Sequence, residues 1–199
     1  MMTRARAIDI PTWAGKAIVT DIDANVILSD LGHRPIAMVH GDDVPALGPC
    51  GPGNVVKMKT GYAGVLSPKE AVILDLTGPL NPEWPESNYT DISDGYVLLG
   101  LWGAESPGML QRLVSVDVER PDLDDQLFLA TSSHGIFVYV INLKLGSPGF
   151  LMACARSDAQ SFFDGLLHIG KPFSLKLAGT ESFDKYLGGR RVSRAKPHI

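Results

Sequence analysis

Runs of apolar residues follow one another closely in the second half of the chain. They occupy residues 126–132 (QLFLATS), 136–145 (IFVYVINLKL) and 150–157 (FLMACARS), with only short Ser, Gly and Pro separators between them. Short turn sequences between apolar runs are typical of adjacent antiparallel strands. The pattern therefore predicts a three-stranded antiparallel arrangement, with further strands at 96–102 and 173–178.

A first helix is predicted between these strands, over residues 104–115. Its apolar residues recur at helical spacing and form one stripe. Ser106 is predicted as the N-cap, with Pro107 at the first helical position. The stripe consists of Met109, Leu110, Leu113 and Val114.

The segment SDAQSFFDGLLHIGK predicts a second helix. Ser157 and Gln160 have the spacing of a capping box, and Gly170 before Pro172 indicates a glycine stop at the C-terminal end. The apolar face of this helix is formed by Phe162, Phe163, Leu166, Leu167 and Ile169. Each helix needs a sheet to cover, so we expect an α+β fold with antiparallel sheets, helices packed on one face and split βαβ elements.

The first third of the chain is less regular. Residues 16–28 predict a strand, residues 36–39 a short partner for it, and residues 55–59 a further strand. Residues 41–53 contain several prolines and glycines, which indicates a surface loop.

The segment after residue 66 leaves two alternatives open. Ser67 followed by Pro68 has the character of a helix N-terminus, whereas Val72 and Ile73 favour a strand.

Domain organisation follows from the positions of the chain breakers. Three prolines within residues 77–88 indicate a boundary between two lobes. We expect an N-terminal β-rich lobe at 1–80 with a Pro/Gly loop, a C-terminal α+β lobe at 89–180, and a polar basic tail at 188–199. A turn is predicted at Asp94-Gly95, leading into the strand at 96–102.

Composition and charge narrow the functional classes. The chain has 199 residues, 45% hydrophobic and 20% charged, with a formal net charge of −4. This balance lacks the positive field that nucleic-acid binding requires, and no apolar run is long enough to cross a membrane. The N-terminus has no apolar segment typical of a signal peptide, so we expect a cytoplasmic location.

Candidate metal ligands and nucleophiles are sparse. Cys154 lies in an apolar run and is predicted to be buried, while Cys50 lies in a Gly/Pro loop without a second cysteine at metal or redox spacing. The histidines have no spacing typical of a metal site, and we expect no metal and no catalytic residue in this chain. They are His33, His40, His134, His168 and His198.

Two charged clusters have an ordinary interpretation beside a functional one. Asp122, Asp124 and Asp125 form an acidic turn that we expect to be solvated rather than to act as an acid/base pair. Asp91 and Asp94 are expected to cap a turn. The cations of the tail are expected to be solvated or to dock on an acidic partner surface. They are Arg190, Arg191, Arg194 and Lys196.

The stretch TDISDGYVLLGLWGAESPGMLQRLVSVDVE resembles the folate-binding domain shared by the glycine-cleavage T-protein and its relatives. A strand there runs into a Gly-Ala turn and a helix ending in Leu-x-x-x-Asp, here Leu113 to Asp117. Within that superfamily the chain is most similar to the gamma subunit of heterotetrameric sarcosine oxidase. That likeness rests on FLATSSHGIFVYVI and FLMACARSDAQSFFDGLL, spans residues 89–169, and extends weakly to GYAGVLSPKEAVILD.

The chain departs from the catalytic T-proteins at one turn. These carry a Gly-Gly turn followed by an aspartate, whereas Ser133-His134-Gly135 is followed here by IFVYV without an acid. The resemblance therefore implies a noncatalytic structural subunit of a complex that oxidatively demethylates sarcosine or a related N-methyl amino acid. It implies larger flavoprotein subunits as partners, with FAD, FMN, NAD and tetrahydrofolate bound on those chains and no cofactor in this one.

Two other hypotheses remain open. The first is a free-standing tetrahydrofolate-binding protein of the T-protein superfamily, in which Trp102, Tyr139 or Arg156 would line a pocket. The second is a small-molecule enzyme whose site is assembled from scattered residues, with His134 near Arg156 as its candidate pair.

Overall fold

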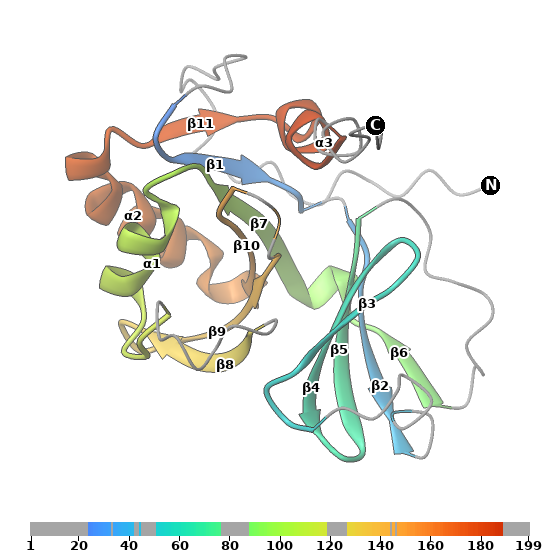
Figure 1. Ribbon diagram of the computed structural model, residues 1–199. Helices are drawn as coiled ribbons and strands as arrows, with labels where there is room; N and C mark the ends of the chain where they lie inside the picture. Colours follow the sequence, from blue (N-terminus) through green and yellow to red (C-terminus); the bar gives the residue numbers. More distant parts are fainter. Residues whose placement is uncertain are drawn as a thin grey trace, which may run out of the picture.

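The described part of the chain forms two β-sheets and three α-helices, seen in the computed structural model in Figure 1. The structure describes residues 24–32, 34–41, 44, 51–76, 88–118, 127–143, 145 and 147–188. The larger sheet, here called sheet A, has the strand order β11-β1-β7-β10-β9-β8. Its strands are β1 (Ile27–Asp30), β7 (Tyr96–Trp102), β8 (Phe128–Ser133), β9 (Ile136–Asn142), β10 (Gly149–Ala155) and β11 (Lys176–Ala178).

Sheet A is antiparallel except at one edge. There β1 pairs in parallel with β11, while its other side pairs antiparallel with β7. A strand near the start of the chain therefore lies between two strands that come much later.

The smaller sheet, sheet B, has the order β3-β4-β5-β2-β6 and is antiparallel throughout. Its strands are β2 (Ile36–His40), β3 (Val55–Lys57), β4 (Gly61–Ser67), β5 (Glu70–Asp75) and β6 (Tyr89–Asp91). The sheets touch along one margin, where Asn54 forms a bridge to Leu127 and Phe128 N–H donates to the Gly53 carbonyl at 2.9 Å.

Two of the helices and sheet B cover opposite faces of sheet A (Figure 1). Helices α1 (Ser106–Leu113) and α2 (Ala159–Gly170) pack on one face, and α3 (Thr180–Gly188) packs with sheet B on the other. Three short 3-10 turns complete the described elements: η4 (Ser93–Gly95), η6 (Arg156–Asp158) and η7 (Lys171–Phe173).

The two cores follow from the two-residue period of the strands. On β7, Val97 and Leu99 face the helices, whereas Leu98 and Trp102 face sheet B and α3. Because β7 is buried on both faces, it reads in sequence as a continuous apolar run rather than an alternating one. A third, smaller cluster covers the far face of sheet B, centred on Ala63 and Ile73.

The fold is α+β with mainly antiparallel sheets, as the sequence predicts. The three apolar runs at 126–157 become the adjacent antiparallel strands β8, β9 and β10. The stripe of the first predicted helix is buried, as are Phe162, Phe163 and Leu166 of the second, whereas Leu167 and Ile169 are partly buried. The open alternative after residue 66 resolves to a strand: Pro68 and Lys69 form a turn between β4 and β5.

Strand pairing near the N-terminus differs from the prediction. The segment 36–39 is not a partner of the preceding strand: β1 belongs to sheet A, while β2 pairs with β5 and β6 in sheet B. Asp94-Gly95 is likewise no hairpin turn, because the 3-10 turn η4 connects β6 of one sheet to β7 of the other. The division into lobes at 1–80 and 89–180 stays a prediction. Strand β1, from the first predicted lobe, belongs to sheet A, and β6, from the second, belongs to sheet B.

Both predicted helix starts are corrected. Glu105 is the N-cap of α1, and Ser106 instead lies inside the helix with its Oγ donating to the Gly103 carbonyl at 2.8 Å. At α2 no capping box forms, because η6 precedes the helix and the Gln160 amide donates to Asp164.

The glycine stop is corrected as well. Gly170 has helical dihedrals, and the left-handed residue is Ser174, with φ 52°. Gly170 is needed for a close approach, since a Cβ there would lie 2.5 Å from the Leu175 side chain.

Several predictions fall outside the described residues. They concern residues 16–23, the loop residues 45–50 with Cys50, most of the boundary at 77–88, the acidic turn at 122–125, His33, and the tail from residue 189 with its arginines, Lys196 and His198.

Candidate functional site

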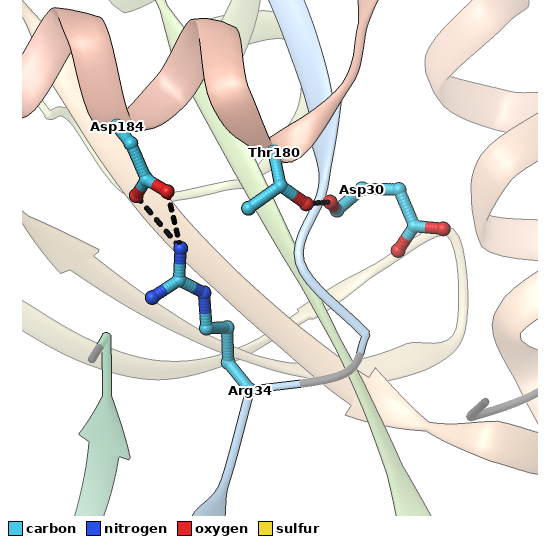
Figure 2. Close-up of polar contacts among 4 residues, drawn as sticks. All are labelled: Asp30, Arg34, Thr180 and Asp184. Carbon is cyan, nitrogen blue, oxygen red and sulfur yellow. Dashed lines mark hydrogen bonds and ion pairs between the residues drawn. The ribbon is translucent and has the colours of Figure 1, made fainter. Parts of the chain in front are cut away.

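The described chain passes between the two sheets at two connections, and an arginine side chain forms hydrogen bonds at each of them. The first runs from β1 to β2. There the Arg34 Nη2 donates to both carboxylate oxygens of Asp184 on α3, at 2.7 and 2.8 Å (Figure 2). The Arg34 side chain is 10% exposed and that of Asp184 50%. Close by, the Thr180 hydroxyl donates to the Asp30 carbonyl at 3.1 Å, so the start of α3 is fixed to the end of β1.

The second connection is η4, between β6 and β7. Arg156, the first residue of η6, donates from Nε to the Asp94 carbonyl at 2.6 Å and from Nη2 to the carbonyls of Ser93 and Tyr96 at 3.2 Å. Ser93 is also bound to sheet B, because its Oγ accepts from the Ile36 N–H at 2.9 Å and donates to the Ile36 carbonyl at 3.2 Å. Arg156 and Ser93 together set how sheet A meets sheet B at this point.

Helix α3 is seated by two aromatic side chains that require glycine opposite them. A Cβ on Gly100 would lie 2.6 Å from the Phe183 ring, and a Cβ on Gly149 would clash directly with the Tyr186 hydroxyl. That hydroxyl donates toward the carbonyls of Ser147 and Pro148, each 3.1 Å away. The absence of a side chain at Gly100 on β7 and at Gly149 on β10 therefore leaves the space that the Phe183 and Tyr186 rings of α3 occupy. We call these two spaces the sockets under α3.

A row of aromatic residues marks the margin where sheet B stops covering sheet A. Tyr139 stacks against Tyr96 and Phe128, with 5.9 Å between ring centroids in each pair, and meets Phe137 edge-on at 5.0 Å. Phe137 is 49% exposed and is the exposed large hydrophobic side chain of the described chain. We name these four residues the aromatic margin and take it as the candidate functional site.

The charge of one sheet B residue, Glu70, acts on this margin. Glu70 lies on the same face of β5 as the buried Val72, and its carboxylate is 3.8 Å from His40 Nδ1. Burial, followed by the negative charge of Tyr96 when ionised, a hydrogen bond to Tyr96 and the charge of Glu70, raises the pKa of Tyr139 to about 12. The Tyr139 hydroxyl is therefore neutral at pH 7, which suits hydrogen bonding and packing rather than proton transfer.

The three predicted pocket residues are each engaged in contacts with other described residues. Trp102 Nε1 donates to Ser29 Oγ at 3.1 Å, and its ring packs on Tyr186. Tyr139 belongs to the aromatic margin, and Arg156 is engaged by the carbonyls of η4. Each of the three side chains already has a role in holding the fold.

The predicted pair of His134 and Arg156 is directed elsewhere. His134 occupies the β8–β9 turn with φ 51°, and its Nδ1 lies 3.3 Å from Ser133 Oγ. Arg156 points instead to η4. No acid/base geometry links the two side chains among the contacts of the described residues.

Cys154 is fully buried on β10, as predicted. Burial, together with the charge of Asp158, raises the pKa of its thiol to about 12, so it is a poor nucleophile at neutral pH. Within the described ranges, no group of three or more His, Cys, Asp or Glu side chains is placed to hold a metal ion. The described helices also include none that is long and apolar enough to span a membrane.

Sequence reasoning missed Phe137, Glu70 and the whole of α3. Phe137 lies within an unbroken apolar run, so nothing in the pattern separates it from its buried neighbours. The aromatic pair of α3 does have helical spacing, at positions 183 and 186, and this signal could have been found.

Comparison with solved structures places the fold. The chain is similar to a chain of the heterotetrameric sarcosine oxidase from Corynebacterium sp. U-96, solved in complex with pyrrole 2-carboxylate. The TM-score is 0.63 at 16% identity, and the alignment covers 77% of this chain and 88% of that one. No protein-family model and no curated protein matches the sequence.

A second similar structure is the glycine cleavage system aminomethyltransferase T from Bartonella henselae. Its TM-score is 0.56 at 14% identity, with 81% of this chain aligned. The alignment spans 50% of the length of that aminomethyltransferase. The fold of this chain is therefore similar to the folds of both proteins.

Proposed function

We propose that this chain is a noncatalytic structural subunit of a sarcosine-oxidase-like complex that oxidatively demethylates sarcosine or a related N-methyl amino acid. The observation that carries the proposal is the extent of the fold match. It takes in 88% of a chain from a heterotetrameric enzyme, whereas only half of the larger aminomethyltransferase is aligned. A chain matched over nearly its whole length is a better guide to this protein's role than part of a longer one.

The use of polar side chains also supports a structural role. Arg34, Arg156 and Trp102 are each engaged in holding the fold, with Asp184, the carbonyls of η4 and Ser29 as partners. Burial raises the pKa of the Cys154 thiol and of the Tyr139 hydroxyl, so each gives up its proton less readily than it would in water. These groups are suited to stability and recognition rather than to bond making.

On this proposal the partners are larger flavoprotein subunits, and FAD, FMN, NAD and tetrahydrofolate are bound by those chains. The complex would be hetero-oligomeric and cytoplasmic. The chain would contribute contact surface, for which an exposed aromatic side chain such as Phe137 is a typical anchor.

The test is purification of the tagged full chain from its own cells under native conditions. We expect flavin-containing subunits to co-purify in fixed stoichiometry, and the assembly to oxidise sarcosine or a related amine. A monomeric chain free of flavoprotein would contradict the proposal.

The alternative of a free-standing tetrahydrofolate-binding protein is separated by calorimetry on the isolated chain. Direct binding of tetrahydrofolate would favour that alternative. Heat of binding only in the presence of the flavoprotein subunits is expected if the chain has the structural role.

A further inference from the structure

We infer that the free edge of β8 is the surface on which a partner subunit docks, by adding an extended, uncharged strand to sheet A. This inference rests on the proposed function, because the strand is assigned to a flavoprotein subunit. It goes further by naming the surface and the mode of binding.

The orientation of the β8 backbone follows from two hydrogen bonds at its start. Asn142 N–H donates to the Leu127 carbonyl, so residue 127 faces β9, whereas Phe128 N–H donates away from β9 to the Gly53 carbonyl. Backbone groups alternate along an antiparallel strand, and the β8–β9 register is unbroken. The N–H and C=O groups of Ala130 and Ser132 therefore point outward from the sheet.

These outward groups are unpaired within the described part of the chain. Strand β8 is the outermost strand of sheet A, and both Ala130 and Ser132 are exposed. Sheet B covers only the start of the strand, where the Phe128 ring packs so closely on β4 that a Cβ at Gly64 would lie 2.3 Å from it.

The edge also lacks the features by which proteins block unwanted strand addition. Lysine, proline and a bulge are the usual devices, and the sequence FLATSS with an unbroken register has none of them. The Gly53–Phe128 hydrogen bond shows that this edge already accepts an antiparallel neighbour at its first position. A partner strand would continue that pairing at Ala130 and Ser132.

Phe137 supplies the side-chain contact for such a strand. It lies directly opposite Ser132 in the β8–β9 register, and its ring is 49% exposed. Neither β8 nor β9 carries a charged residue. The complementary segment is therefore an uncharged extended backbone with an apolar side chain at the position next to Phe137, the mode of recognition known as β-augmentation.

Amide hydrogen exchange on the full chain, free and in the native flavoprotein complex, tests the inference. In the free chain we expect fast exchange at Ala130 and Ser132 and slow exchange at Leu129 and Thr131, which bond to β9. In the complex, Ala130 and Ser132 should slow by at least about tenfold. A complex that forms without this protection would overturn the β8 inference and leave the proposed function standing.

Substitutions on the free edge of β8 provide a second test of the inference. Ser132→Pro removes an outward N–H without removing a β8–β9 hydrogen bond, and should weaken assembly by at least about tenfold. The matched control Ser132→Thr keeps the donor and should assemble normally. Ala130→Lys places a charge on the same edge and replaces the proline variant if that one fails to fold.

The remaining outcomes of these measurements also decide the matter. Normal assembly of both edge variants would overturn the inference. Concentration-dependent protection of Ala130 and Ser132 in the free chain would overturn it too, since the strand would then come from a second copy. Failure of any flavoprotein to bind would overturn the proposed function, and with it the assignment of the strand.

Discussion

Arg34 and Asp184 are 150 residues apart in the sequence and form a two-point ion pair, with both Asp184 oxygens within 2.8 Å of one guanidinium nitrogen. The pair is asymmetric. The Arg34 side chain is 10% exposed and its Nε has no hydrogen-bond partner among the described residues, whereas half of the Asp184 side chain is exposed. Asp184 is thus the compensating charge for a guanidinium that has little access to water.

Removing Asp184 should therefore destabilise the protein more than an exposed helix charge would. We expect Asp184→Ala to lower the free energy of unfolding by about 1–2 kcal/mol, a discounted value because the carboxylate is half exposed. The control is Glu181→Ala, an exposed acid on the same helix, which should change stability by less than about 1 kcal/mol. Urea unfolding measures both; equal effects would show that the ion pair contributes nothing specific.

Filling the sockets under α3 should be destabilising. Gly149→Ala and Gly100→Ala would drive a methyl group into Tyr186 and Phe183, and we expect losses of about 1–3 kcal/mol each. Gly165→Ala is the control, because a Cβ there meets nothing within 4 Å and alanine favours the α2 helix.

The same glycine series has a rescue test. Phe183→Leu combined with Gly100→Ala should recover part of the stability lost in Gly100→Ala alone, since the smaller side chain leaves room for the methyl group. Thermal unfolding of the four proteins measures this coupling, and strictly additive losses would argue against a direct clash.

Arg156 should be irreplaceable by lysine. Its guanidinium donates to three carbonyls, those of Ser93 and Asp94 in η4 and that of Tyr96 at the start of β7, and a single ammonium cannot reproduce that fork. We expect Arg156→Lys and Arg156→Met to lower stability by similar amounts, about 1–2 kcal/mol, and to speed amide exchange at Gly95. Full stability of the lysine variant would mean that charge alone, rather than the geometry of the fork, holds the turn.

Alkaline pH should destabilise the protein in part through Cys154. Its pKa is raised from 9.0 to about 12, so the thiol ionises in the unfolded chain well before it does in the folded one. Its contribution to stability is complete below pH 9 and is lost as the pH rises towards about 12, at up to about 1.4 kcal/mol per pH unit. Cys154→Ala should show a shallower decline than the wild type in urea unfolding measured across this range. An identical slope would contradict the assignment.

Local sequence signals predicted the parts of the fold that depend on local pairing. The β8, β9 and β10 strands are joined by short Ser/Gly turns, so their order and direction follow from adjacent residues. The parallel pairing of β1 with β11 depends on contacts between residues such as Leu28 and Leu177, and no local pattern encodes it.

The candidate site likewise contains features that local sequence predicts and features that it does not. The burial of Cys154 was predictable from its apolar surroundings, but the role of Arg156 was not, because its acceptors are backbone carbonyls about 60 residues away. The start of α2 was misplaced for a related reason. The sequence Ser157-Gln160 fits a capping box, but Ser157 lies in η6 and the Gln160 amide donates to Asp164 instead.

The place of β1 between β7 and β11 has a consequence for how the protein is made. Strand β1 leaves the ribosome early, yet both of its neighbours are synthesised much later, whereas β2 to β5 can pair soon after they emerge. Such non-local pairing slows folding and leaves a hydrophobic strand waiting for its partners. Nascent chains that stop short of residue 176 would therefore carry β1 with one bare edge, and these are the species we expect chaperones to retain.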